Sequence, residues 1–241
     1  MKKMIPLFLG VIIFSGLAAQ DSTALRNHYK KVYQQALAYN DANAAINALQ
    51  NYIAVDNNVL YKDTLAMLYY NVKSYYSSLL LSEEVYKANP ENVIAMARTA
   101  ECYDELGDPK TAIELYEKEV PVTRSPYHIY KLGICQYQLK RTVECEASAR
   151  AALADTSSKK IGVVFTMADG SQQSVPVDAA ASNLLGVLKM DTKNFAGAKA
   201  DFQLALKLFP DFAGAKGNLD VCDRNLKPKT PAKPAVKPKG K

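Results

Sequence analysis

The residues that could carry chemistry in this chain are few, and their spacing does not assemble a reactive site. The two histidines, His28 and His128, lie far apart in the sequence, and each stands near tyrosines instead of a second metal ligand. Acidic neighbours such as Glu83 and Glu84 are expected on solvated helix faces, not as acid–base pairs. The sequence contains no phosphate-binding glycine loop, nucleophile elbow or zinc-protease motif. We therefore predict a protein without catalytic residues, metal or cofactor.

The elements that would position these residues follow from an internal repeat. Similar segments begin at Arg26, Val59, Val93, Pro126 and, after a longer interval, Ala179. Each reads as a helix, a tight turn and a second helix, and a period of 33 or 34 residues is typical of helical solenoids. Such a fold presents an extended surface instead of a catalytic pocket.

Small and aromatic residues recur at matching places in these segments, where paired helices must approach closely. In the segment from Val93, a Gly107-Asp108-Pro109 turn ends one helix and opens the next. The matching small, aromatic and proline positions are Gly133, Gly186, Ala112, Ala198, Tyr116, Phe202, Pro90 and Pro210.

This pattern resembles the tetratricopeptide repeat over roughly Arg26 to Pro210, followed by an amphipathic capping helix at about 212–226. The resemblance implies an all-α, right-handed superhelical solenoid of about five helix pairs. The chain departs from the family in having no tryptophan, in Glu119 where a small residue is usual, and in Ser78 for alanine. A related short-repeat helical array is the competing fold.

The resemblance also implies where a partner would bind, because the first helices of each pair line a concave groove in this family. We expect the groove to include Tyr70, Arg98, Glu101, Tyr127, Tyr130 and Tyr137. The tyrosine stripe has helical spacing, which more often indicates packing than recognition, although tyrosine is also favoured at interfaces. Of the family's carboxylate clamp only Lys30 and Arg98 remain, so we expect a different ligand.

Residues 159–177 are surplus to the repeat and are predicted to form a β-hairpin. Ile161, Val163 and Phe165 favour strands. Asp169-Gly170 is a strong hairpin signal, and Pro176 confines the second strand to an edge or an end. A lone hairpin is marginally stable in water, so it either packs on its own repeats or meets a partner.

The four cysteines, Cys102, Cys135, Cys145 and Cys222, show no CxxC spacing that would suggest zinc or redox work. We expect them to be buried as small apolar residues. A Cys135–Cys145 disulfide is the alternative, because these residues lie on paired helices of one repeat.

The two ends of the chain differ from its body. Residues 1–19 combine two lysines, an apolar run and small residues, as in a secretory signal peptide; an uncleaved anchor is the alternative. Residues 227–241 hold six lysines, four prolines and no acid. Without this tail the charges balance, so the basic net charge of +6 gives no reason to expect nucleic acid as a partner. The tail is expected to be disordered, as a linker or in weak contact with an anionic surface.

Taken together, these features predict a signal peptide (1–19), a repeat domain (22–226) and a tail (227–241). The leading functional hypothesis is a non-catalytic scaffold in the bacterial periplasm, or associated with the outer membrane, that binds a protein or peptide of the cell envelope. A structural tether, whose Lys-Pro tail contacts anionic polymer or lipid, is the second hypothesis. An enzyme with an unrecognised site is the third, and no small-molecule substrate is expected.

Overall fold

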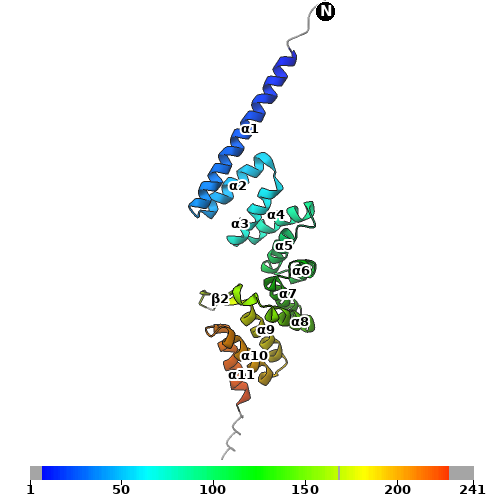
Figure 1. Ribbon diagram of the computed structural model, residues 1–241, viewed down its shortest axis with the longest axis vertical. Helices are drawn as coiled ribbons and strands as arrows, with labels where there is room; N and C mark the ends of the chain where they lie inside the picture. Colours follow the sequence, from blue (N-terminus) through cyan, green and yellow to red (C-terminus); the bar gives the residue numbers. More distant parts are fainter. Residues whose placement is uncertain (1–6, 168, 228–241) are drawn as a thin grey trace, which may run out of the picture. The chain divides into compact units, whose positions relative to one another are not determined.

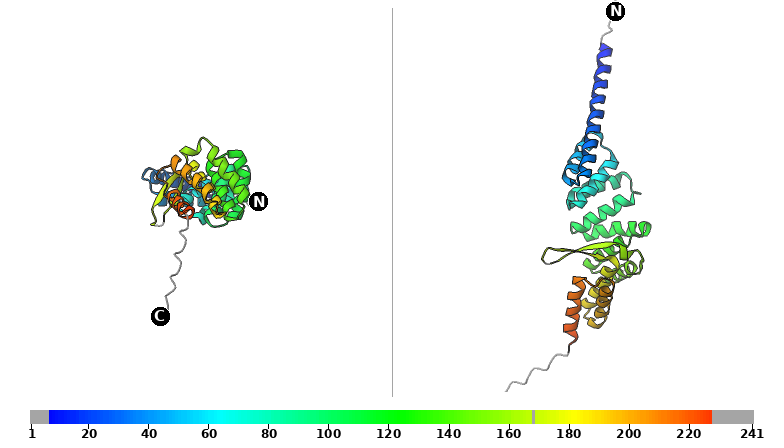
Figure 2. Two further views of the ribbon diagram at one scale, coloured as in Figure 1. Left: turned by 90° about the horizontal axis from the view of Figure 1, so that it is seen from below. Right: turned by 60° about the vertical axis from the view of Figure 1, so that its left-hand side comes forward.

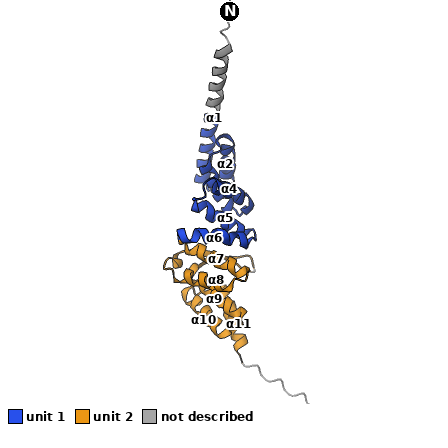
Figure 3. Cartoon of the chain, turned by 90° about the vertical axis from the view of Figure 1, so that its right-hand side faces the viewer, with its two compact units in different colours: residues 1–123 blue, residues 124–241 orange. Residues whose placement is uncertain are grey.

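The computed structural model describes residues 7–167 and 169–227, and it describes side chains from Ser22 onward. The predicted tail after Lys227 lies outside the described residues, as do residues 1–6 and the side chains of the predicted signal peptide. The chain divides into two compact units, unit 1 (Met1–Thr123) and unit 2 (Arg124–Lys241) (Figure 3).

Unit 1 consists of antiparallel helix pairs in which each helix packs on the next one in the chain (Figure 1). Its described helices are α1 (Leu7–Ala38), α2 (Ala42–Asp56), α3 (Val59–Asn71), α4 (Tyr75–Ala88), α5 (Val93–Glu105) and α6 (Pro109–Thr123). The predicted repeat starts at Val59 and Val93 are the first residues of α3 and α5. No break marks the predicted start at Arg26, because α1 runs through it as one helix.

Unit 2 continues the helix pairs and contains the inserted hairpin. Its described elements are α7 (Pro126–Gln138), α8 (Thr142–Ala154), a 3-10 turn η1 (Ser158–Lys160), β1 (Gly162–Thr166), β2 (Gln172–Pro176), α9 (Val177–Asp191), α10 (Phe195–Leu208) and α11 (Ala213–Leu226). The fifth repeat therefore begins at Val177, two residues before the predicted position. The fold class is confirmed: consecutive helix pairs with one β-hairpin.

The turns inside the helix pairs share one backbone conformation. At each turn one residue has a positive φ, and the next residue donates its amide to a carbonyl five positions earlier. This is the Schellman arrangement, which satisfies carbonyls at the end of a helix. Gly107, as predicted, fills the position in one turn, whereas Asn40, Lys73, Lys140 and Lys193 fill it in the others. Glycine and asparagine favour this conformation, whereas lysine is uncommon in it, so the three lysine turns could not be recognised from sequence.

The core of each pair is built from small residues facing large ones. The predicted small positions Ala112 and Ala198 are fully buried, and so are Ala100 and Ala149. Gly186 in α9 shows the tightest fit, since a Cβ there would lie 2.5 Å from Cε1 of the buried Phe202 ring in α10. The small-residue pattern therefore has the packing role that the sequence predicted.

The hairpin packs one face on the helices of unit 2 (Figure 2). Val175 is fully buried, and the Phe165 ring lies 5.0 Å from that of Phe212, between centroids. Ile161 and Val163 are half-buried against the same core. This face of the hairpin thus packs on the protein's own repeats, which is one of the two predicted alternatives.

Candidate functional site

The candidate site in unit 1 lies on the first helices of two successive pairs, α3 and α5. Leu60, Asp63 and Met67 follow one another at helical spacing on α3, and Ile94, Arg98 and Glu101 do so on α5. We call these six residues the α3–α5 face. The two rows are joined because Arg98 contacts Asp63 across the helices.

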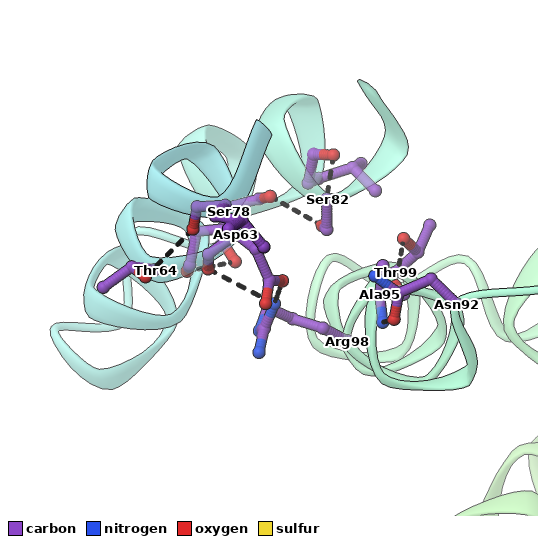
Figure 4. Close-up of polar contacts among 11 residues, drawn as sticks. Asp63, Thr64, Ser78, Ser82, Asn92, Ala95, Arg98 and Thr99 are labelled. Atoms are coloured by element: carbon purple, nitrogen blue, oxygen red, sulfur yellow. Dashed lines mark hydrogen bonds and ion pairs between the residues drawn. The ribbon is translucent and has the colours of Figure 1, made fainter. Parts of the chain in front are cut away.

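Figure 4 shows the contact between Arg98 of α5 and Asp63 of α3. The Arg98 guanidinium donates to the Asp63 carboxylate and also, at 3.4 Å, to the Asp63 backbone carbonyl. The Arg98 side chain is only 12% exposed and that of Asp63 is 30% exposed. The cation is therefore neutralised within the protein, and the predicted groove residue Arg98 is already engaged by a carboxylate.

Apolar side chains flank this ion pair and face solvent. Leu60 is 76% exposed and Ile94 is 63% exposed, and they occupy equivalent positions of consecutive repeats. Met67, one turn beyond Asp63, is also exposed. Exposed apolar residues that gather at one place are a common mark of an interaction surface.

The other two predicted residues of unit 1 are Glu101, which belongs to this face, and Tyr70, which lies one turn beyond Met67 on α3. Glu101 is half-buried on α5. Tyr70 is half-buried near the end of α3, where its ring meets that of Tyr75 edge-on at 5.3 Å between centroids. Tyr70 therefore contributes part of its surface to packing against the start of α4.

In unit 2 the predicted tyrosines are more strongly engaged in packing. Tyr130 is 3% exposed and belongs to the core, while Tyr127 and Tyr137 are half-buried against it. The Tyr137 hydroxyl donates to the Asp191 carboxylate at 2.8 Å. Burial and that hydrogen bond raise the pKa of Tyr137. The burial of Tyr130 favours the packing alternative for this residue, and recognition by Tyr127 and Tyr137 stays a prediction.

On α9, the first helix of the last pair before α11, side chains contact neighbouring helices of unit 2. Asn183 accepts a hydrogen bond from Asn218 of α11 at 3.0 Å. Val187 and Met190 pack against the cluster of Phe202 and Cys222. Among these surfaces on first helices, the α3–α5 face carries the most exposed apolar side chains, Leu60 and Ile94.

Among the side chains with reactive chemistry, the four cysteines are buried and His128 is half-buried, whereas His28 is exposed. His28 and His128 each meet the ring of a neighbouring tyrosine edge-on, and all four cysteines are buried free thiols. Burial raises the pKa of Cys102 and Cys222, and that of Cys145 to about 11. Among the described residues, no cluster of His, Cys, Asp and Glu could hold a metal ion. Within the same residues, no helix has the length and apolar character needed to span a membrane.

Sequence and fold comparisons agree on the class of protein. A tetratricopeptide repeat family model matches residues 79–129, from α4 into α7. No curated protein is similar enough in sequence to count as a relative. The MamA protein of Desulfovibrio magneticus RS-1, from residue 41 onward, has a similar fold with a TM-score of 0.63 and 15% identity, covering 78% of this chain and 97% of that one.

Two further solved structures share the fold. YrrB, described as a TPR protein with an unusual peptide-binding site, has a TM-score of 0.62 and 15% identity, covering 78% of this chain and 89% of that one. A tetratricopeptide repeat protein from Parabacteroides merdae ATCC 43184 has a TM-score of 0.65 and 12% identity, covering 84% of this chain and 73% of that one. The repeated helix pairs define a helical-repeat protein with the fold of tetratricopeptide repeat proteins. Within it, residues 79–129 match the tetratricopeptide repeat family model.

Proposed function

We propose that the protein is a non-catalytic scaffold of the bacterial cell envelope that binds a segment of another protein on the first helices of its repeats. The observation that carries the proposal is the pair Leu60 and Ile94, two large apolar side chains left exposed at equivalent positions of successive repeats. Packing inside unit 1 leaves most of their surface uncovered, whereas a bound segment would bury it.

The chemistry of the α3–α5 face indicates what kind of segment fits. Leu60, Ile94 and Met67 favour apolar side chains on the ligand. Arg98 is neutralised by Asp63, and Glu101 lies one turn further along α5. A free carboxylate would find no unpaired cation in this group of residues. The expected ligand is therefore an internal, apolar protein segment, not a chain terminus held by its carboxylate.

The proposed localisation is inferred from residues 1–19, whose sequence has the features of a signal peptide. Export to the periplasm, or association with the outer membrane, would bring the scaffold to envelope proteins. Mass spectrometry of the N-terminus of the protein isolated from its cells would show whether the leader is removed.

A paired-variant experiment tests the binding face. Leu60→Ser combined with Ile94→Ser alters the α3–α5 face, whereas Tyr76→Ser combined with Leu80→Ser alters α4, where these side chains are 65% and 54% exposed. Both double variants remove exposed apolar surface, so they differ only in where on unit 1 that surface lies. Proteins crosslinked in cells are recovered from the envelope fraction, and circular dichroism verifies folding.

Capture of a partner by the parent and the α4 variant, together with its loss in the α3–α5 variant, would support the proposal. Equal capture by all three would place recognition elsewhere. Capture of nothing, with all three folded, would count against the scaffold function in the envelope.

A tether is the second candidate, because the basic excess of the sequence is concentrated in residues 227–241. Each lysine contributes about 1 kcal/mol near an anionic membrane. In this case, deletion of residues 227–241 would release the protein from the envelope fraction while partner capture continued. Unchanged fractionation of the deletion variant would eliminate the tether.

A further inference from the structure

The inserted hairpin has one face that its own unit does not cover. Side chains alternate across a strand, so Val163, Phe165 and Val175 point toward the helices while Val164 and Thr166 point away. Val164 is 60% exposed on this outer face. The sheet contains two strands among the described residues, so β1 has a neighbour along one edge, which is β2.

The register shows which backbone groups point to the open edge of β1. The amide of Val177 donates to the carbonyl of Ile161 at 2.9 Å, and that of Met167 donates to the carbonyl of Ser171 at 2.8 Å. Because hydrogen-bonded and non-hydrogen-bonded pairs alternate in an antiparallel ladder, Val163 and Phe165 bond to β2. The N–H and C=O groups of Gly162, Val164 and Thr166 therefore point away from β2.

The two edges of the hairpin differ in how they are protected. Proteins commonly blunt an open strand with proline or with charged side chains. On β2, Pro176 lacks an amide to offer at its outer edge. On β1, the segment Gly162–Thr166 contains neither proline nor charge. The β1 edge therefore offers a template for another strand.

We propose that a second copy of this chain pairs its β1 strand, antiparallel, with this open edge, with Val164 opposite the partner's Val164. The outward-pointing groups are symmetric about Val164, so Gly162 of one copy meets Thr166 of the other. This two-fold arrangement forms about six backbone hydrogen bonds. No like charges meet across the axis, since both strands are uncharged.

The pairing turns two marginal hairpins into one four-stranded sheet, which is a more stable arrangement. Each inner face remains on the helices of its own copy. A strand of five residues buries less than the roughly 1,200 Å² of a stable interface. The dimer is accordingly weak and depends on protein concentration.

Proline substitutions distinguish the two edges without breaking the hairpin. Val164→Pro removes an amide that points away from β2, and Ser174→Pro removes the equivalent outward amide on β2. Sedimentation equilibrium of the naturally processed protein should show dimers at high concentration. Val164→Pro should weaken association about tenfold or more, because two hydrogen bonds are lost across the two-fold axis. Ser174→Pro should leave association unchanged.

Amide exchange by NMR gives a direct second readout. The Val164 and Thr166 amides should exchange more slowly as protein concentration rises, while the Ser174 amide should not change. A parent protein that stays monomeric would overturn the proposal, as would association that survives Val164→Pro or that both variants abolish. A strand of a different protein captured on β1, without dimers, would also overturn it.

Discussion

Gln173 of β2 accepts a hydrogen bond from the backbone amide of Ala213, the first residue of α11, at 3.2 Å. The same side chain donates to the carbonyl of Asp211 at 2.6 Å. The N-cap residue of α11, Phe212, has no side-chain cap of its own. The hairpin thus provides, from 40 positions earlier in the chain, the polar partner that the start of this helix lacks.

Loss of this distant cap should weaken the end of unit 2. Gln173→Ala is expected to lower the free energy of unfolding by about 1–2 kcal/mol, the usual effect of removing a helix cap. The Ala213 amide should also exchange faster with solvent. Urea unfolding and NMR exchange measure the two effects.

Gln172→Ala is the matched control, since Gln172 is exposed on the opposite face of the hairpin. Equal stability of the two variants would show that the cap contributes nothing.

The close approach of α9 and α10 predicts that a glycine-to-alanine substitution lowers stability at Gly186 but not at Gly217. Gly186→Ala places a methyl group 2.5 Å from the Phe202 ring and should cost about 1–3 kcal/mol of stability. At Gly217 in α11 a Cβ would meet nothing within 4 Å. Gly217→Ala should be neutral or stabilising by up to about 1 kcal/mol. Similar losses in both variants, measured by denaturant unfolding, would contradict the packing.

Tyr130 should behave as a core residue. Because it is 3% exposed, Tyr130→Ala is expected to cost about 3–5 kcal/mol, as for other buried aromatic residues. Tyr76→Ala, at a side chain 65% exposed, should change stability by no more than about 0.5 kcal/mol. If thermal unfolding showed Tyr130→Ala to be as stable as the parent, the packing interpretation would be wrong.

Glu83 makes stability depend on pH. Hydrogen bonds from Lys87, first, and from Tyr103 lower the pKa of the Glu83 carboxyl below its ordinary value of 4.5. The stabilisation is therefore present above pH 4.5 and is lost as the pH falls through the lowered pKa. Glu83→Gln should be less stable than the parent at neutral pH, and the difference should shrink in acid.

Urea unfolding at several pH values would measure this change. Glu114→Gln, at an exposed carboxylate of α6, controls for the loss of a surface charge. A difference between Glu83→Gln and the parent that stayed constant down to pH 3 would refute the linkage.

The cysteines should resist modification while the protein is folded. All four are buried, and the raised pKa of about 11 for Cys145 leaves little thiolate at pH 8. Iodoacetamide should label the thiols of the native protein slowly. After denaturation it should label all four. If mass spectrometry without reductant found only two of them labelled after denaturation, at Cys102 and Cys222, the Cys135–Cys145 disulfide would be established instead.

Much of the fold could be predicted because its determinants are local. The starts at Val59, Val93 and Pro126 agree with the structure to the residue, since capping asparagine or serine residues precede them. The hairpin was predicted because Asp169-Gly170 separates two runs of strand-forming residues. The turns with a positive-φ lysine, at Lys73, Lys140 and Lys193, were harder to predict, because lysine is not a usual turn residue.

The candidate site was less predictable because it depends on contacts between repeats. Sequence spacing identified Arg98 as a surface residue, but the carboxylate that neutralises it comes from Asp63 in the preceding repeat. Helical periodicity alone could not separate the buried Tyr130 from the half-buried Tyr127. The link from Gln173 to Ala213 joins distant residues and had no signal in the sequence.

The hairpin also restricts the positions at which this chain can gain repeats during evolution. Repeat arrays lengthen by duplication of a helix pair that contacts only its neighbours. A pair copied between α10 and α11 would separate Phe212 from Phe165 and remove the cap from Ala213. A pair copied between α4 and α5 would leave these contacts intact. The hairpin therefore fixes the place of α11 directly after α10, while unit 1 keeps the freedom to lengthen.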